Sequence, residues 1–112
     1  MKKGEIWWVD PGVPRGSEPG YRRPAVIVSA NKFNASSILT VIVAFLTTNA
    51  RRAGDPGNVW LPADQTGLPE SSTLNVTQIA TIDRRSLSRR LGRVPDDLMR
   101  EVDEGLRLVM EL

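Results

Sequence analysis

Two continuous apolar runs stand out in the pattern of hydrophobic and polar positions along the chain. Residues 24–29 (PAVIVS) and 38–46 (ILTVIVAFL) are rich in β-branched side chains and are separated by a polar stretch. Such runs favour strands buried on both faces, so we expect both to be central strands of one sheet. Residues 4–9 (GEIWWV) also favour a strand, in which the adjacent Trp7 and Trp8 must point to opposite faces.

Shorter patterns add the outer strands of this sheet. We expect strands at residues 58–61 and 72–82, the second with a bend, and a turn followed by an exposed edge strand in the arginine-rich stretch 84–93. Glycine and proline concentrate in residues 10–20 (DPGVPRGSEPG), and turn residues recur in 47–58 (TTNARRAGDPGN). These two segments are therefore predicted to be loops between strands.

The C-terminal segment has the periodicity of a helix. Pro95 suits a first helical turn, Asp96 and Asp97 suit its positive end, and apolar side chains recur at helical spacing at Leu98, Val102, Leu106 and Val109. We expect an amphipathic helix over residues 96–108, packed on the sheet. With about five to seven mostly antiparallel strands, because the connections are short, the fold class is α+β and mainly β, a small barrel with a C-terminal helix.

Length and composition limit the chemistry that this fold can carry. The 112 residues, 40% hydrophobic and 25% charged, fit one globular domain spanning residues 1–112. The chain has no cysteine and no histidine. Disulfides, thiolate nucleophiles, cysteine zinc sites and a histidine base are therefore excluded, and we expect no cofactor and no metal. No apolar run has the length of a membrane span or of a signal peptide, so we expect a cytoplasmic protein and no membrane partner.

Charge is distributed unevenly along the chain. The 15 basic and 13 acidic residues give a net charge of +2. Residues 96–112 hold six of the acids and only two of the basic residues, so the preceding part of the chain is clearly basic. A basic body permits a polyanionic partner, although solvated surface arginines would look the same in the sequence.

Several short motifs follow one another in a fixed order along nearly the whole chain. They are GEIWWVD at residues 4–10, GSE at 16–18, RPAVIVS at 23–29, LTT at 46–48, VTQIATID at 76–83, LG at 91–92 and the helical segment 96–108. The set resembles the MazF/PemK family of toxin ribonucleases. The resemblance implies an SH3-like barrel of the CcdB/PemK/MazF type with a C-terminal helix, assembled as a symmetric homodimer.

The same resemblance implies a function. Members are toxins of type II toxin–antitoxin systems that cleave single-stranded RNA, mainly mRNA, at specific sequences and so inhibit translation. The implied protein partner is a cognate MazE-like antitoxin, whose acidic and initially disordered segment covers the RNA-binding groove. The basic body of this chain agrees with either an RNA or an acidic antitoxin segment as partner.

RNA can be cut without a metal when its own 2′-hydroxyl attacks the neighbouring phosphate, which leaves a 2′,3′-cyclic phosphate and a 5′-hydroxyl. The reaction needs a proton acceptor, cationic donors to the phosphate and a donor to the departing oxygen. Arg23 matches the family's Arg-Pro arginine, and its guanidinium can hold two phosphate oxygens at once. Thr47 matches the threonine at the end of the long apolar strand. The alternatives are an arginine that braces Glu18 and a threonine that only ends a strand.

Two further catalytic candidates lie in the first predicted loop. Glu18 is a proton acceptor or a positioning partner of Arg23, because a carboxylate beside an arginine has a lowered pKa. Ser17 binds the phosphate or caps a turn. The Kid-like branch of the family carries a histidine in place of Ser17 and an Arg-Cys-Asp arrangement where this chain has residues 75–77, so the identity of the general base stays open.

The RNA-binding candidates are residues with donors, acceptors or rings in the loops and at strand ends. They are Tyr21, Arg22, Thr48, Arg51, Arg52, Asn75, Thr77 and Gln78. Tyr21 could stack on a base, and the neutral amides and hydroxyls suit base edges of unstacked RNA, whereas their structural alternative is hydrogen bonding within the sheet. Trp7, Trp8 and Phe45 are interpreted as core or dimer-interface residues.

Two other functions compete with RNA cleavage. A CcdB-like toxin that inhibits gyrase shares the fold, but that family relies on a Trp-Gly-Ile C-terminus, whereas this chain ends in Met110, Glu111 and Leu112. A nucleic-acid-binding barrel without catalysis is the second alternative. Substituting Arg23 or Thr47 separates them, because only a ribonuclease has cleavage to lose.

Overall fold

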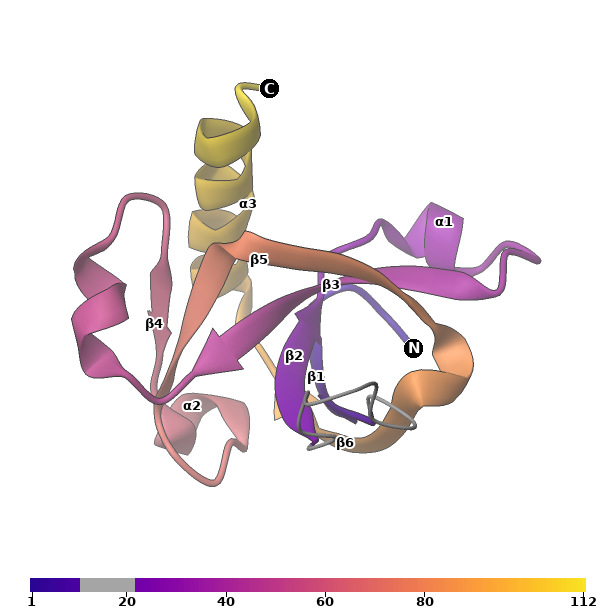
Figure 1. Cartoon of the computed structure of the whole chain (residues 1–112), viewed down its shortest axis with the longest axis horizontal. Helices are drawn as coiled ribbons and strands as arrows, with labels where there is room; N and C mark the ends of the chain where they lie inside the picture. Colours follow the sequence, from indigo (N-terminus) through magenta and orange to yellow (C-terminus); the bar gives the residue numbers. More distant parts are fainter. Residues whose placement is uncertain (11–21) are drawn as a thin grey trace, which may run out of the picture.

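A curled antiparallel sheet forms the body of the protein (Figure 1). The computed structural model describes residues 1–10 and 22–112, in which six strands pair in the order β4-β5-β3-β2-β1-β6. They are β1 (Glu5–Val9), β2 (Arg23–Ile27), β3 (Thr40–Thr47), β4 (Val59–Leu61), β5 (Ser72–Asp83) and β6 (Leu87–Arg93). All neighbouring strands are antiparallel, so the sheet is a half-barrel and the predicted mainly β fold class is confirmed.

The central strands are buried on both faces, as their continuous apolar runs predicted. One face of the sheet contributes Val26 and Ala44 to a core cluster beneath the C-terminal helix. The opposite face contributes Ala25, Ile27 and Val43 to a second core cluster. Because successive residues of a strand point to opposite faces, a strand lying between two cores needs apolar side chains at every position.

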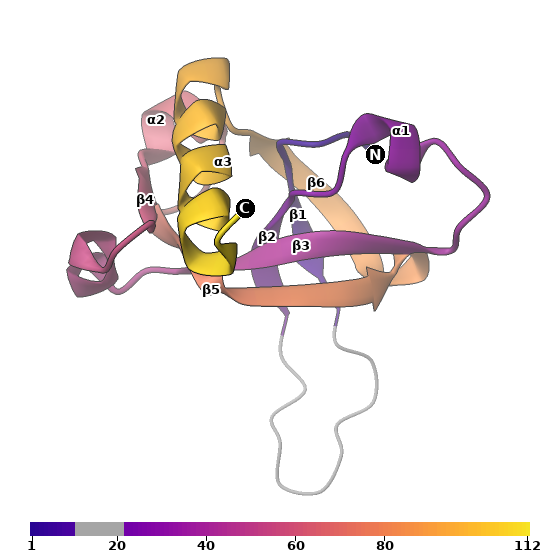
Figure 2. The same cartoon turned by 90° about the horizontal axis from the view of Figure 1, so that it is seen from above.

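The helix α3 (Asp96–Met110) covers one side of the sheet, as Figure 2 shows. Its buried residues are Val102, Gly105 and Leu106, so the predicted amphipathic face is confirmed over the middle turns. Val109, the last position of the apolar stripe, is 42% exposed. The last turn extends past the strands and has no sheet beneath it (Figure 1). No helix within residues 1–10 and 22–112 is long and apolar enough to cross a membrane.

Short helical turns occupy connections in which the sequence predicted only polar links. They are α1 (Asn31–Asn34), the 3-10 turn η1 (Ala50–Gly54), α2 (Ala63–Thr66) and the 3-10 turn η2 (Arg84–Ser86). Helices of four residues contain too few positions for an apolar period, so a sequence pattern does not reveal them.

The helix α2 brings the two edges of the sheet together. A Cβ at Gly92, in edge strand β6, would overlap the carbonyl oxygen of Thr66 at the end of α2. Only glycine allows this close backbone approach. The connection between β4 and β5 therefore closes one side of the half-barrel against β6.

Strand β5 bends where the sequence predicted a bend. Ala44 of β3 pairs with Ile79, but Leu46, two residues further on, pairs with Leu74. Residues 75–78 of β5 therefore bulge out of the ladder, and the Oδ1 atom of Asn58 accepts a hydrogen bond from the amide of Val76 at 3.0 Å, which fixes the bulge. Gln78, the last residue of the bulge, accepts a hydrogen bond from Arg23 at the start of β2.

Candidate functional site

A cleft lies where β1 and β3 end and β2 begins, beside the segment that leads into β5. Its apolar side chains are Trp8, Pro24, Leu46, Leu68 and Pro69. Its polar side chains are Arg22, Arg23, Thr47, Thr48, Glu70 and Ser72. Four residues predicted from two separate segments of the sequence, Arg22, Arg23, Thr47 and Thr48, thus line one cleft.

Arg23 begins β2, and neutral groups hold its guanidinium. Its Nη2 atom donates a hydrogen bond to Oε1 of Gln78 at 3.0 Å. The guanidinium carbon lies 4.5 Å from the centre of the Phe45 ring, close enough for a cation–π contact. No ion pair joins Arg23 to a carboxylate within residues 1–10 and 22–112. Its positive charge is therefore positioned by its neighbours but not neutralised by them.

Thr47 ends β3 and is half-buried at the cleft. Its Oγ1 atom accepts a hydrogen bond from the amide of Asn49 at 3.2 Å. A hydroxyl that accepts such a bond keeps its own proton for donation. Thr47 can therefore donate a hydrogen bond to a group bound in the cleft, and exposed Thr48 lies next to it.

Arg22 lies on the other wall of the cleft. Its guanidinium is 5.4 Å from the centre of the Trp8 ring, and its Nη2 atom donates to the hydroxyl of Ser88 at 2.9 Å. Trp8 is half-buried and lines the cleft, so it is not part of the buried core, and the expectation of a dimer-interface role stays a prediction. For Trp7 and Phe45 the expectation of a core position is confirmed, because both pack against the second core cluster.

Arg23 also lines a second hollow, on the face of the sheet that carries the second core cluster. Phe45, Ile82 and Val9 give this hollow an apolar floor, and Asp10 and Asp83 add carboxylates. Hydrogen bonds from the side chain and the backbone of Arg85 hold the pKa of Asp83 below its usual range. Arg23 thus separates the two hollows and can reach either of them.

The other predicted RNA-binding residues lie outside the cleft. Asn75 and Thr77 belong to the β5 bulge, where the Thr77 hydroxyl donates to Oδ1 of Asn75 at 2.7 Å. Arg51 and Arg52 lie in η1, and Arg52 pairs with Asp55 at 3.4 Å. Gln78 reaches the site only through Arg23. The remaining candidates, Ser17, Glu18 and Tyr21, lie outside the described residues.

Comparison with known proteins gives the family. The family model described as PemK-like, MazF-like toxin of type II toxin–antitoxin system matches residues 2–110. The chain belongs to this family. It is 47% identical over 112 residues to the endoribonuclease MazF6 of Mycobacterium tuberculosis, which covers all of this chain and 98% of that protein. It is also 31% identical over 112 residues to the endoribonuclease EndoA of Bacillus subtilis, with all of this chain and 96% of EndoA covered.

A solved structure of the family has the same architecture. The MazE–MazF complex of Deinococcus radiodurans contains a chain that superposes with a TM-score of 0.80 at 26% identity, covering all of this chain and 96% of that one. The barrel with a C-terminal helix that the motifs implied is therefore confirmed as a MazF-like fold.

Two polar residues of the cleft were missed in the sequence of this MazF-like toxin. Glu70 places an exposed carboxylate at the cleft, and the buried Ser72 donates from its hydroxyl to the Glu70 carbonyl oxygen at 3.0 Å. Neither belongs to a motif that carried the resemblance, and only the packing of the start of β5 and the segment before it brings them to the cleft that Arg23 lines. Within the described residues, no group of three or more acidic side chains is arranged to hold a metal ion.

Proposed function

We propose that this chain is a toxin that cuts single-stranded RNA, mainly mRNA, at a specific short sequence and thereby inhibits translation. The observation that carries the proposal is the shared cleft of Arg23 and Thr47 in a chain of this family. Relatives that are 47% and 31% identical are named endoribonucleases, which supports the same activity here.

The cleft provides two of the three groups that the reaction needs. The 2′-oxygen of RNA attacks the adjacent phosphorus, the bond to the 5′-oxygen breaks, and a 2′,3′-cyclic phosphate and a 5′-hydroxyl result. One proton leaves the 2′-oxygen and one reaches the 5′-oxygen. Arg23, which stays protonated at any working pH, stabilises the negative charge on the phosphate. Thr47 donates a hydrogen bond to a phosphate oxygen or to the departing oxygen.

The proton acceptor is the third group. Glu18 is the catalytic candidate that the motif offers for this acceptor, and Ser17 is a candidate donor to the phosphate. The acceptor needs to reach hydrogen-bond distance of the 2′-hydroxyl only when RNA is bound. Arg23 itself is a poor acceptor, because a guanidinium carries five N–H donors and no acceptor atom.

The proposed partners follow from the family and from the charge of the cleft. The solved MazE–MazF complex of a relative supports a cognate MazE-like antitoxin. We propose that its acidic, disordered segment competes with RNA for Arg22 and Arg23, because neither arginine is paired with a carboxylate of the described chain. We further propose a symmetric homodimer that acts in the cytoplasm.

RNA cleavage in the presence of EDTA tests the proposed function. Purified protein is incubated with a long single-stranded RNA, the cut sites are mapped, and the new ends are identified chemically. We expect discrete cuts at one short sequence, with cyclic-phosphate and 5′-hydroxyl ends. An Arg23→Gln preparation purified in parallel controls for contaminating nucleases. Intact RNA with folded protein would contradict the proposal and favour gyrase inhibition or binding without cleavage.

A further inference from the structure

The wall of the cleft formed by Trp8 continues onto the edge strand β6. Trp8 pairs with Pro24 of β2 on one side and with Arg89 of β6 on the other. Directly paired residues of antiparallel strands present their side chains on the same face of the sheet. Pro24, Trp8 and Arg89 therefore form one row that begins in the cleft and ends at the edge of the sheet.

Arg22 is fixed above this row. Its guanidinium lies 5.4 Å from the centre of the Trp8 ring and donates to the Ser88 hydroxyl at 2.9 Å. The Ser88 hydroxyl in turn donates to the carbonyl oxygen of Trp8 at 3.2 Å. Strand β6 thus holds the guanidinium over the ring. An indole and a guanidinium are both flat groups on which nucleobases stack.

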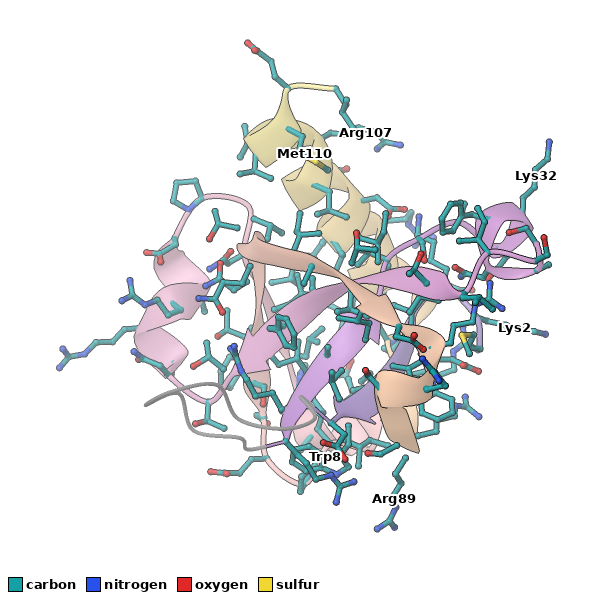
Figure 3. The ribbon with its side chains drawn as sticks, turned by 45° about the vertical axis from the view of Figure 1, so that its right-hand side comes forward. Lys2, Trp8, Lys32, Arg89, Arg107 and Met110 are labelled. Atoms are coloured by element: carbon teal, nitrogen blue, oxygen red, sulfur yellow. The ribbon has the colours of Figure 1, made fainter. Side chains whose placement is uncertain are left out.

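The row is cationic and lacks acidic partners in the described chain. Arg22 and Arg89 are both exposed, and neither forms an ion pair within residues 1–10 and 22–112. Figure 3 shows Trp8 and Arg89 at the same end of the molecule, whereas Lys32 and Arg107 lie at other ends. A flat platform between unpaired cations fits single-stranded nucleic acid, whose bases stack and whose phosphates are anionic.

We propose that Trp8 and Arg22 form a stacking platform for a nucleobase of single-stranded RNA flanking the bond that is cut, and that Arg89 binds a backbone phosphate of the same segment. The proposal rests on the proposed function and extends it, because it assigns a second binding subsite outside Arg23 and Thr47. The platform recognises the face of a base and not its edge. It therefore strengthens binding at one nucleotide position without selecting a particular base there.

Abasic substitution along the RNA tests the platform. The probe is a fluorescein-labelled RNA that contains the mapped cut sequence, with a 2′-O-methyl group at the cut nucleotide to prevent cleavage and one abasic site placed at each position in turn. Binding is measured by anisotropy with wild-type protein, Trp8→Leu and Trp8→Phe. We expect Trp8→Leu to weaken binding of the intact RNA by about 5- to 150-fold. Trp8→Phe keeps a ring and should lose less.

The decisive readout is the coupling between the protein variant and one RNA position. One flanking abasic site should weaken the binding of RNA to wild-type protein. The same site should leave binding to Trp8→Leu almost unchanged, because that variant already lacks the indole on which the base would stack. A structural role of Trp8 would weaken binding by the same factor at every position, and that result would overturn the proposal. If Trp8→Leu fails to fold, Arg22→Gln carries the same test, because its exposed side chain is not part of the core.

Salt dependence tests the phosphate contact of Arg89. We expect Arg89→Gln to lower the slope of log affinity against log salt by about 0.7, the value for one phosphate of a single strand. Lys32→Gln and Arg107→Gln are the matched controls and should leave the slope unchanged. An unchanged slope in Arg89→Gln would overturn this part. Failure of wild-type protein to cut RNA at all would instead refute the proposed function, so the two failures are distinguishable.

Discussion

Two cation-rich hollows of this protein differ in the partners of their cations. In the hollow lined by the N-terminus and β6, Lys3 pairs with Asp103 at 2.9 Å, and other basic side chains pair with Glu5 and Asp96. In the cleft at the strand ends, Arg22 and Arg23 are held by a hydroxyl, an amide and two aromatic rings.

The difference decides which charges remain available to a ligand. Exposed ion pairs add at most about 1 kcal/mol of stability, but they cancel the field of each cation locally. Neutral partners fix a guanidinium in place without cancelling its charge, which is the arrangement that stabilises a developing negative charge. The comparison therefore favours the cleft, and not the hollow with more basic residues, as the phosphate site that we propose.

The largest expected effect on RNA cleavage comes from replacing the planar guanidinium of Arg23 by the ammonium group of a lysine. In Arg23→Lys the charge is kept, but the ammonium cannot hold two phosphate oxygens from the position set by Gln78 and Phe45. We expect the single-turnover rate of RNA cleavage to fall about 100- to 1,000-fold. A lysine variant with the wild-type rate would show that charge alone is sufficient and that the neutral positioning groups are irrelevant.

A smaller loss is expected from Thr47→Val, which keeps the shape of the side chain and removes its hydroxyl. Losing one hydrogen bond to a charged phosphate group should lower the cleavage rate by about 10- to 100-fold. Thr47→Ser restores the hydroxyl and should recover most of the rate in the same assay. Equal losses in both variants would indicate that Thr47 acts through the strand end and not through its hydroxyl.

Gln78→Glu gives Arg23 a carboxylate partner, like the ones that the basic side chains have in the hollow lined by the N-terminus and β6. The new carboxylate would face the Arg23 guanidinium and cancel its charge locally. We expect about tenfold weaker RNA binding and a salt slope smaller by about 0.7. Gln78→Met removes the hydrogen-bond acceptor without adding charge, and it should leave the salt slope unchanged. The same slope in the glutamate variant as in wild-type protein would refute the comparison.

The smallest expected effect concerns Glu5, in the hollow lined by the N-terminus and β6, and the stability of the fold. Burial alone would raise the pKa of Glu5, but hydrogen bonds from the Lys2 amide and the Trp7 indole, with the charge of Arg90, hold it below its usual range. A lowered pKa in the folded state means that the ionised group stabilises the fold above the unfolded value of about 4.3. This contribution is lost as the pH falls through the folded value.

Thermal unfolding of Glu5→Gln against pH measures this contribution. The variant should unfold at a lower temperature than wild-type protein near pH 7, and the two curves should converge as the pH falls below about 4. RNA cleavage at neutral pH should be unaffected, because Glu5 lies in the other hollow. A constant difference at all pH values would mean that the charge of Glu5 is not the cause.

The sequence pattern located the central strands well, because a strand packed against a core on both faces needs apolar side chains at every position. Residues 24–29 and 38–46 are apolar at nearly every position, and the helix after Pro95 has clear periodicity and an acidic first turn. Val109 belongs to the apolar stripe but is exposed, because periodicity shows which face is apolar and not where the surface beneath it ends. A different limit applies to α1 and α2: they have four residues each, too few to show a helical period in the sequence.

The site was predictable only where motifs mark it. Arg23 and Thr47 were found through motifs, and the structure brings them to one cleft. The roles of Trp8 and Gln78 depend on tertiary contacts: a β5 bulge aims Gln78 at Arg23, and a hydroxyl on β6 holds Arg22 over Trp8. Glu70 reaches the cleft through the packing of a polar connection. None of these arrangements leaves a period or a spacing in the sequence.

Cleavage of a mapped RNA by Arg23→Gln and Arg93→Gln, measured side by side in EDTA, tests the central claim most directly. Both variants remove one positive charge, but Arg93 pairs with Asp96 at 3.0 Å and Arg23 has only neutral partners among the described residues. The account predicts a loss of at least about 100-fold for Arg23→Gln and a wild-type rate for Arg93→Gln. Equal rates in the two variants would contradict it.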